Sequence, residues 1–254
     1  MSIFDLTGRV AVITGGNGGI GLGMARGLAE AGAAIAVVGR NEAKSAAAVA
    51  ELEQSGARAI SVVADVTDKA AVADMAARVA RDLSRIDILV NNAGINIRKQ
   101  PQDLAVAEWR QVIDVNLTSA YLCSKAVYPA MKTAGGGKII NIGSMMSIFG
   151  ASFTPAYAAS KGGIVQFTRS CACAWAADNI QANAVLPGWI DTDLTKRARE
   201  QIDGLHDRVL ARTPAARWGA ISDFAGIAVF LASPASDFVT GTAIPIDGGY
   251  SIMG

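Results

Sequence analysis

Histidine and cysteine are scarce in this sequence of 254 residues, which contains one histidine, His206, and three cysteines. Zinc sites are built from clusters of these residue types, and a Ser-His-Asp hydrolase needs a histidine as its base. We therefore expect no bound metal, and a hydrolase triad remains open only if His206 serves in it. Cys171 and Cys173 are two positions apart in a helix-like stretch, so they are expected to point to different sides.

Charge of one sign and long apolar runs are also missing. Charged residues make up 18% of the chain, and the net charge is +1, so there is no basic surplus to attract nucleic acid. No apolar run approaches the ~18 residues of a membrane-spanning helix, and the N-terminal sequence MSIFDLTGR lacks the pattern of a signal peptide. We expect a cytoplasmic globular protein that binds neither nucleic acid nor membrane.

Short apolar runs alternate with helix-like stretches along the chain. The run VAVI at residues 10–13 is continuous, which is typical of a parallel strand buried on both faces. The expected strands are residues 10–13, 34–38, 59–63, 86–90, 138–142, 181–185 and 242–246, and the expected helices are 22–31, 41–54, 69–83, 105–131, 154–177 and 222–232. The pattern predicts an α/β fold, a single-domain doubly wound parallel β-sheet (Rossmann fold) with helices on both faces, over residues 1–254.

One long polar segment, at about residues 187–219, interrupts this alternation. Ligands of open α/β sheets bind beyond the carboxyl ends of the strands, and this segment follows the sixth expected strand. We therefore expect it to form a substrate loop that folds over the site. We expect the basic run within this segment, KRAR at residues 196–199, to form a solvated helix face rather than part of a binding site.

A glycine-rich turn, TGGNGGIG at residues 14–21, joins the first expected strand to the first expected helix. Glycine at positions 15, 19 and 21 allows the backbone to approach a pyrophosphate, and the helix N-terminus offers free N–H groups to the anion. The spacing G-x-x-x-G-x-G departs from the usual G-x-G-x-x-G. The turn nevertheless predicts a dinucleotide site because it follows a strand and precedes a helix.

Tyr157 and Lys161 are four residues apart in the expected helix 154–177, so both project from one face. A fixed cation beside a phenol favours the phenolate, and we expect it to move the pKa of Tyr157 down toward neutrality. Such a phenol can give a proton to a nascent alkoxide or take one from an alcohol. A half-buried tyrosine beside a solvated lysine is the ordinary alternative.

Taken together, these motifs identify the chain as a member of the short-chain dehydrogenase/reductase family over essentially its full length. The matching features are TGGNGGIG at 14–21, Asp65 with Val66, NNAG at 91–94, Asn116, Ser144, Tyr157, Lys161, Pro187 with Gly188, and Thr192.

The resemblance implies an NAD(P)-dependent oxidoreductase that interconverts a secondary alcohol and a ketone. It makes Tyr157 the general acid/base and Lys161 the cation that lowers its pKa and binds the nicotinamide ribose. Ser144 is implied to bind the substrate oxygen, and Asn116 to hold a water linked to Lys161. The implied cofactor residues are Gly15, Asn17, Gly19, Ile20, Gly21, Arg40, Asp65, Val66, Asn92, Ala93, Gly94, Tyr157, Lys161, Pro187, Gly188, Ile190 and Thr192.

The end of the second expected strand bears on the choice of cofactor. Sites that prefer NAD place an acidic residue there to accept from the ribose 2'-hydroxyl, and this chain has Gly39. Arg40 follows and could pair with a 2'-phosphate. We therefore expect NADP as the cofactor. NAD stays open as the alternative, since Gly18 stands where many NADP-dependent members of the family have a basic residue.

Further matches resemble the sugar-acid branch of the family, the ketogluconate and 3-deoxy-ketogluconate dehydrogenases. They are NIR at 96–98, SMMS at 144–147, TPAARWG at 213–219 and SDFVTG at 236–241. The candidate substrate-binding residues are Asn96, Arg98, Ser144, Met146, Phe153, Tyr157 and Trp189. Arg98 could hold a carboxylate, whereas the methionines and aromatic residues could equally line a pocket for an apolar alcohol or steroid.

Two other functions stay open. A 3-oxoacyl-[acyl-carrier-protein] reductase shares this scaffold, and a noncatalytic NADP-binding sensor or scaffold would keep the glycine turn but lose the acid/base pair. Family resemblance also implies a homotetramer that uses the helices at about 105–131 and 154–177 and the C-terminal strand.

Overall fold

The computed structural model describes residues 2–253, so residues 1 and 254, the two ends of the expected domain, lie outside it. Seven parallel strands form one sheet in the order β3-β2-β1-β4-β5-β6-β7. Their bounds are β1 Val10–Thr14, β2 Ala34–Gly39, β3 Ala59–Val63, β4 Ile88–Asn91, β5 Gly137–Ile142, β6 Ile180–Pro187 and β7 Ala243–Ile246. The doubly wound parallel sheet expected from the alternating pattern is confirmed.

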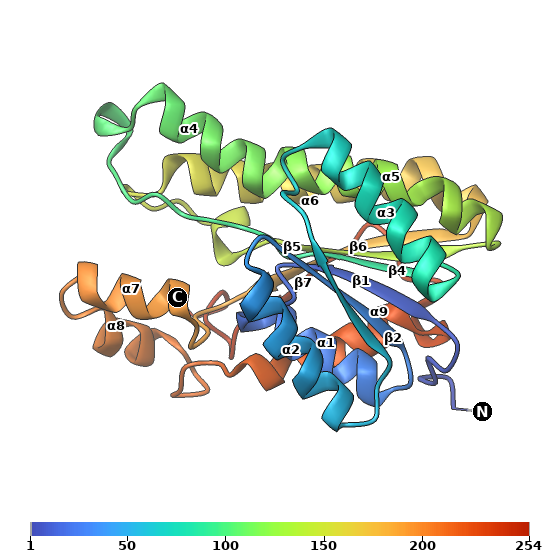
Figure 1. The fold of residues 1–254 in the computed structure, drawn as a ribbon. Helices are drawn as coiled ribbons and strands as arrows, with labels where there is room; N and C mark the ends of the chain where they lie inside the picture. Colours follow the sequence, from blue (N-terminus) through green and yellow to red (C-terminus); the bar gives the residue numbers. More distant parts are fainter. Residues whose placement is uncertain (1, 254) are drawn as a thin grey trace.

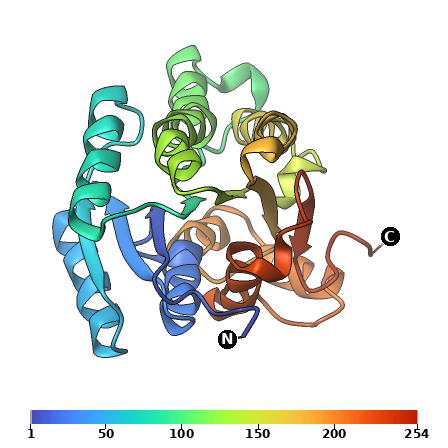
Figure 2. The same ribbon diagram turned by 90° about the vertical axis from the view of Figure 1, so that its right-hand side faces the viewer.

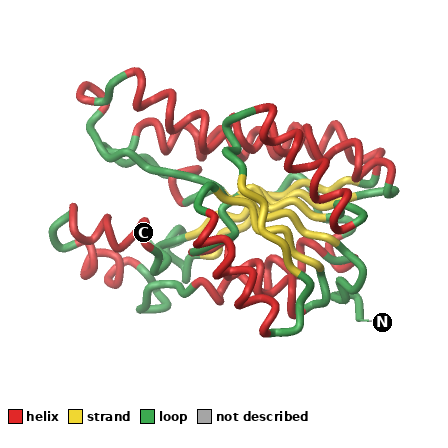
Figure 3. Tube along the Cα trace, viewed as in Figure 1, coloured by secondary structure: helices red, strands yellow, loops and turns green. Residues whose placement is uncertain are grey.

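Helices cover both faces of this sheet (Figures 1 and 2). Their bounds are α1 Gly19–Glu30, α2 Glu42–Gln54, α3 Lys69–Leu83, α4 Val106–Ile113, α5 Ser119–Thr133, α6 Pro155–Trp175, α7 Asp193–Gln201, α8 Leu205–Arg212 and α9 Ala225–Ala232. Helices α3, α4, α5 and α6 lie on one face, and α1, α2 and α9 lie on the other (Figure 3). No helix within residues 2–253 is long and apolar enough to cross a membrane.

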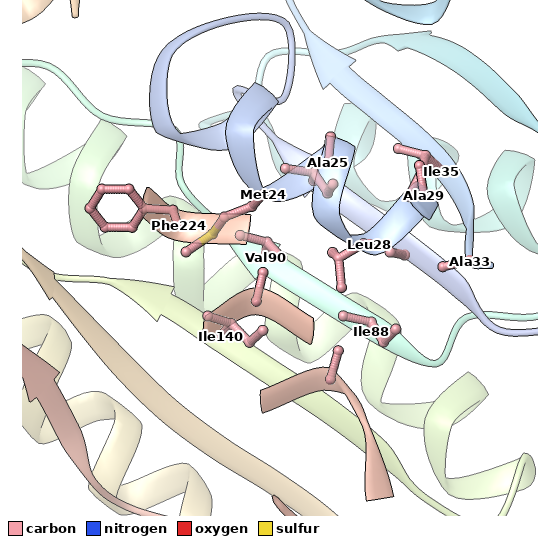
Figure 4. Packing of buried hydrophobic residues seen from close by; sticks show 14 of the residues in the cluster. Met24, Ala25, Leu28, Ala29, Ala33, Ile35, Ile88, Val90, Ile140 and Phe224 are labelled. Carbon is pink, nitrogen blue, oxygen red and sulfur yellow. The ribbon is translucent and has the colours of Figure 1, made fainter. Parts of the chain in front are cut away.

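Successive residues of the strands enter opposite cores, which explains their continuous apolar sequence. In β1, Ala11 and Ile13 pack with residues of α1 and α9, whereas Val10 and Val12 pack with α3, α5 and α6. Figure 4 shows part of the first core, where Leu28 of α1 lies beside Ile88 of β4 and Met24 lies near Phe224 and Val90. Burial of both faces removes the alternation of polar and apolar residues that a half-exposed strand shows.

The expected helix 105–131 contains an interruption. It consists of α4, a π-helical turn at Asp114–Thr118, and α5. A π turn accommodates one more residue than an α turn, and it often marks a functional site. Asn116 lies in this turn and is buried.

The polar segment 187–219 contains α7 and α8, which lie apart from both helix layers (Figure 1). Ala198, Leu205 and Val209 form a small buried cluster of their own, against which Trp189 and Trp218 pack. This segment therefore has a local core that is separate from the two cores of the sheet.

Candidate active site

A cavity of about 390 Å³ opens beyond the carboxyl ends of the central strands. Its walls come from the loops after β1, β4, β5 and β6, from the start of α6, and from the first residues of α7. The sequence-predicted residues that line it are Gly15, Asn17, Gly19, Ile20, Asn92, Ala93, Gly94, Asn96, Arg98, Ser144, Met146, Phe153, Tyr157, Lys161, Pro187, Gly188, Trp189, Ile190 and Thr192. Gly21, Arg40, Asp65, Val66 and Asn116 lie outside the lining.

The glycine turn is held closely against the loop after β4. A Cβ on Gly21 would lie 2.5 Å from both the Asn92 Nδ2 and the Gly15 carbonyl oxygen, so only glycine fits there. The Asn92 Nδ2 donates to the carbonyl oxygens of Thr14 and Gly15, at 3.1 Å each. Gly15 has a φ of +64°, a conformation that favours glycine.

This turn leads directly into α1, whose first residues line the cavity. The N-cap, Gly18, has no side chain to occupy the free backbone N–H groups of the first turn. A close backbone approach and a helix N-terminus facing the cavity are the features that a pyrophosphate requires. The residues present therefore fit a dinucleotide.

The end of β2 has glycine in place of the acidic residue typical of NAD sites. A Cβ on Gly39 would lie 2.5 Å from the Asn17 Nδ2, which itself donates to the Ser45 Oγ at 3.0 Å. Arg40 is exposed, and its Nη1 lies 3.8 Å from the Asp65 Oδ2. The pKa of Asp65 is lowered, chiefly because it accepts hydrogen bonds from the backbone N–H and hydroxyl of Thr67.

Lys44 of α2 is a basic residue at the cavity that the sequence reasoning missed. It lies over the glycine turn, since a Cβ on Gly18 would be 3.0 Å from the Lys44 Nζ. The same Nζ lies 3.5 Å from the Asp193 Oδ2 at the start of α7. The sequence signal that could have identified Lys44 is its position in the first turn of α2, directly after β2. The Asn41 side chain caps this turn by accepting a hydrogen bond from the Lys44 N–H at 2.9 Å.

Tyr157 and Lys161 lie one turn apart on α6, and the Lys161 Nζ is 5.7 Å from the centre of the Tyr157 ring. Lys161 is only 4% exposed, and its ammonium donates to the Ile142 carbonyl oxygen at 2.6 Å. Burial lowers the pKa of Lys161 to about 8. The predicted juxtaposition of phenol and ammonium is therefore present in the structure.

The pKa of Tyr157, in contrast, is not lowered as the sequence predicts. Burial raises the pKa of Tyr157, while its hydrogen bond with Ser144 and the positive charge of Arg98 offset part of that rise. The prediction was wrong because the sequence shows the cation but not the loss of hydration around the phenol, which disfavours the charged form. Tyr157 is accordingly a protonated group at neutral pH.

Asn116 joins the π turn to the loop after β4 and to α6. Its Oδ1 accepts from the Ile95 N–H at 2.8 Å, and its Nδ2 donates to the Ile95 carbonyl oxygen at 2.9 Å and to the Ser160 Oγ at 3.0 Å. These three bonds hold the strand-end loop beside the helix that carries Tyr157 and Lys161. The structure thus gives Asn116 a positioning role that the sequence did not reveal.

Arg98 brings a positive charge into the cavity, close enough to Tyr157 to act on its pKa. Its Nη1 donates to the Gln201 Oε1 at 2.9 Å and its Nη2 to the Leu194 carbonyl oxygen at 3.3 Å, so it is held against α7. Burial lowers the pKa of Arg98. Among residues 2–253, no carboxylate lies within ion-pair distance of this guanidinium.

The cavity thus combines a glycine turn that fits a phosphate, a hydrogen-bonded phenol and hydroxyl, and a guanidinium that has no acidic partner within the described residues 2–253. The phenol can exchange a proton with an oxygen atom, and the guanidinium can bind a carboxylate in two-point geometry. Such a site suits proton transfer to or from the alcohol or ketone oxygen of an acid.

Comparison with known proteins gives consistent matches over nearly the whole chain. Residues 15–251 match the profile of a family described as enoyl-(acyl carrier protein) reductase. The chain is 42% identical to 2-dehydro-3-deoxy-D-gluconate 5-dehydrogenase of Bacillus subtilis (strain 168), a match that covers 97% of this chain and 96% of that protein. It is 40% identical to cis-4-hydroxycyclohexanecarboxylate dehydrogenase of Sinomonas cyclohexanicum, covering 96% and 97%.

A similar solved structure is that of a gluconate 5-dehydrogenase from Burkholderia cenocepacia J2315 in complex with NADP and tartrate. It superposes with a TM-score of 0.93 at 41% sequence identity, covering 98% of this chain and 97% of that one.

Proposed function

The chain belongs to the short-chain dehydrogenase/reductase family, and on that premise we propose that it interconverts a secondary alcohol and a ketone on a sugar acid with NADP as cofactor. The observation that carries the proposal is the presence of Arg98 in the cavity that holds Tyr157 and Ser144. An uncompensated guanidinium beside an acid/base group recognises a carboxylate on the same molecule as the reacting carbinol. The partner of this protein is therefore a small anionic substrate.

Tyr157 is the proton donor and acceptor of the proposed reaction. In reduction, its hydroxyl gives a proton to the oxygen of the former ketone, and in oxidation the phenolate takes the proton of the carbinol. Ser144, hydrogen-bonded to Tyr157, steadies the charge that develops on that oxygen. The nicotinamide, when bound, supplies or accepts the hydride.

Lys161 and Asn116 position this pair. The Lys161 ammonium is fixed by the Ile142 carbonyl oxygen beneath the Tyr157 ring, where its charge favours the phenolate as it forms and where it can bind a ribose hydroxyl. Asn116 ties α6 to the loop after β4, which keeps the phenol in line with the cavity floor. We include in this proposal the water molecule that the family resemblance implies, held by Asn116 and linked to Lys161.

NADP is favoured over NAD by the charges at the glycine turn. Arg40, which follows β2, and Lys44 over Gly18 would hold the ribose phosphate, and Gly39 presents no acidic side chain to a ribose 2'-hydroxyl. The pyrophosphate would lie against the backbone from Gly15 to Ile20, with Asn92, Ala93 and Gly94 beside it. Related structures were solved with NADP.

We further propose that residues 187–219 form the substrate loop of a single domain. Thr192, Asp193 and Leu194 line the cavity, and both Lys44 and Arg98 contact the first residues of α7. These contacts allow α7 to close the cavity when the ligands are in place.

A cytoplasmic homotetramer is the proposed form of the protein. Trp109 on α4, Tyr121 on α5, and Phe238 and Ile252 near the C-terminus are exposed large apolar side chains, which favours their burial between subunits. Light scattering at micromolar concentration tests this, and a monomer would contradict it.

Two enzyme alternatives have support of their own. The matched family profile is described as an enoyl-(acyl carrier protein) reductase, and a carrier-bound substrate is what it has in common with a 3-oxoacyl-[acyl-carrier-protein] reductase. Met146 and Phe153 would suit the alicyclic acid named for the Sinomonas relative. A panel of gluconate, 2-dehydro-3-deoxygluconate, cis-4-hydroxycyclohexanecarboxylate and acetoacetyl thioesters with both cofactors decides between them. Turnover of thioesters alone would transfer the assignment to the reductase, and no turnover at all would favour the noncatalytic sensor.

A further inference from the structure

Thr154 carries a buried hydroxyl that the fold itself does not use. It occupies the N-cap position of α6, where a threonine side chain ordinarily accepts a hydrogen bond from the first turn of the helix. Here the backbone angles are φ −137° and ψ 46°, Pro155 follows, and the side chain makes no capping bond. Thr154 is 4% exposed, and its Oγ1 has no hydrogen-bond partner within residues 2–253.

Asn96, on another segment of the cavity wall, also has a buried oxygen without a partner among the described residues. It lies on the loop after β4, two residues before Arg98, and its Oδ1 is buried without a partner. In the described part of the chain, three buried side-chain oxygens lack a hydrogen bond, and two of them, on Asn96 and Thr154, belong to residues that line the catalytic cavity. Buried polar atoms in folded proteins almost always have partners, so these two oxygens at the cavity wall are available to a bound molecule.

We propose that Thr154 and Asn96 are specificity-determining residues that hydrogen-bond the hydroxyl groups of the substrate, so that the cavity selects a polyhydroxylated acid over an alicyclic one. This inference rests on the proposed function, and it identifies the substrate hydroxyl groups as the feature that the cavity recognises. The Thr154 Oγ1 can donate or accept, and the Asn96 Oδ1 accepts, so each can pair with a substrate hydroxyl.

Other residues of the cavity wall show why Thr154 and Asn96 are needed to distinguish a sugar acid from an alicyclic acid. Met146 and Phe153 give the cavity apolar surface that an alicyclic ring could cover as well as a sugar chain could. Such a ring, however, would bury the Thr154 and Asn96 oxygens without a partner, and leaving buried polar groups unpaired is what rejects a substrate analogue that lacks hydroxyls. Both kinds of acid could pair with Arg98, so the carboxylate does not distinguish them.

The test compares two substrates in the same enzyme preparation. One is gluconate or 2-dehydro-3-deoxygluconate, whichever the unmodified enzyme oxidises faster, and the other is cis-4-hydroxycyclohexanecarboxylate. The variants are Thr154→Val, which keeps the shape and removes the hydroxyl, and the matched control Thr154→Ser, which keeps the hydroxyl. The measured quantity is the ratio of kcat/KM for the sugar acid to that for the cyclohexane acid, which does not depend on the fraction of folded enzyme.

We expect Thr154→Val to lower this ratio about tenfold, the effect of one lost hydrogen bond, and Thr154→Ser to hold it within about threefold of the unmodified value. Asn96→Leu should lower the ratio in the same direction. An equal loss on both substrates, or an unchanged ratio in Thr154→Val, would show that Thr154 is structural and overturn the inference while the proposed function stands. If the unmodified enzyme prefers the cyclohexane acid or oxidises neither substrate, the proposed function fails and the inference with it.

Discussion

Replacing Arg98 with methionine tests whether the guanidinium binds the carboxylate of the substrate. The substitution keeps a long side chain at the cavity wall but removes the charge and the donors that now reach Gln201 and Leu194. A carboxylate about 4 Å from a unit charge, at an effective dielectric constant near 20, gains about 4 kcal/mol. Arg98 is half-buried and already hydrogen-bonded to α7, so we take about half to three quarters of that value.

A loss of ~2–3 kcal/mol corresponds to a fall in kcat/KM of roughly 30- to 150-fold for the sugar acid. We expect most of it in KM, because the carboxylate is bound equally before and during the chemical step. An uncharged polyol of the same length, such as sorbitol, provides the internal comparison, since its weak turnover should change less than about threefold.

The matched control is Gln201→Ala, which removes the side-chain contact of Arg98 with α7 but leaves the guanidinium in the cavity and its bond to the Leu194 carbonyl oxygen in place. Steady-state kinetics with NADP at saturating concentration gives all three comparisons. If Arg98→Met lowers turnover of the acid and of the polyol equally, or if Gln201→Ala reproduces its effect, then Arg98 acts by holding α7 in place, and the assignment of the carboxylate to this residue is refuted.

Further predictions concern the acid/base group and the cofactor. Tyr157→Phe should lower kcat in both directions by about 10²- to 10⁴-fold, with NADPH binding followed by fluorescence titration nearly unchanged; full activity would exclude the proposed proton transfer. Because burial raises the pKa of Tyr157 above its ordinary value, and oxidation needs its phenolate, the rate of oxidation should rise with pH throughout the range from pH 7 to pH 10. Reduction needs the protonated phenol, which persists over this range, so its rate should fall only above about pH 10. A rate of oxidation that falls with rising pH, or a rate of reduction that already falls near neutrality, would contradict this reasoning. Arg40→Ala and Lys44→Gln should each weaken NADP binding by about tenfold while changing NAD binding less than threefold, as measured by calorimetry, and a variant that weakens both cofactors equally would point to the pyrophosphate instead.

Much of the fold was predictable because local signals agree with the tertiary structure. The helix α3 begins and ends at the expected residues: Asp68 caps its first turn by accepting from the N–H groups of Ala70 and Ala71, and Ser84 adopts the left-handed conformation after its last residue. The strands were predictable for the same reason, since a parallel strand buried on both faces must be continuously apolar. Helix starts were less accurate where glycine leads, and α1 begins at Gly19 rather than at residue 22.

The site was predictable where the residue type alone carries the chemistry, and not where the surroundings do. Tyr157 and Lys161 follow from their spacing, but the hydration lost by Tyr157 depends on segments far away in sequence. Lys44 looks like any solvated lysine until the fold places it over Gly18. Thr154 looks like an ordinary helix cap, and only the structure shows that its hydroxyl makes no capping bond.

The extra residue in the turn Asp114–Thr118 sets the rotational phase between α4 and α5. An α-helix advances about 100° per residue, so deleting one residue from this turn would twist one helix against the other by about that angle. Val112 would leave the interior, or the row formed by Cys123, Val127 and Met131 would swing off the sheet. This chain should therefore tolerate insertions and deletions in its loops far better than within the segment formed by α4, the π turn and α5.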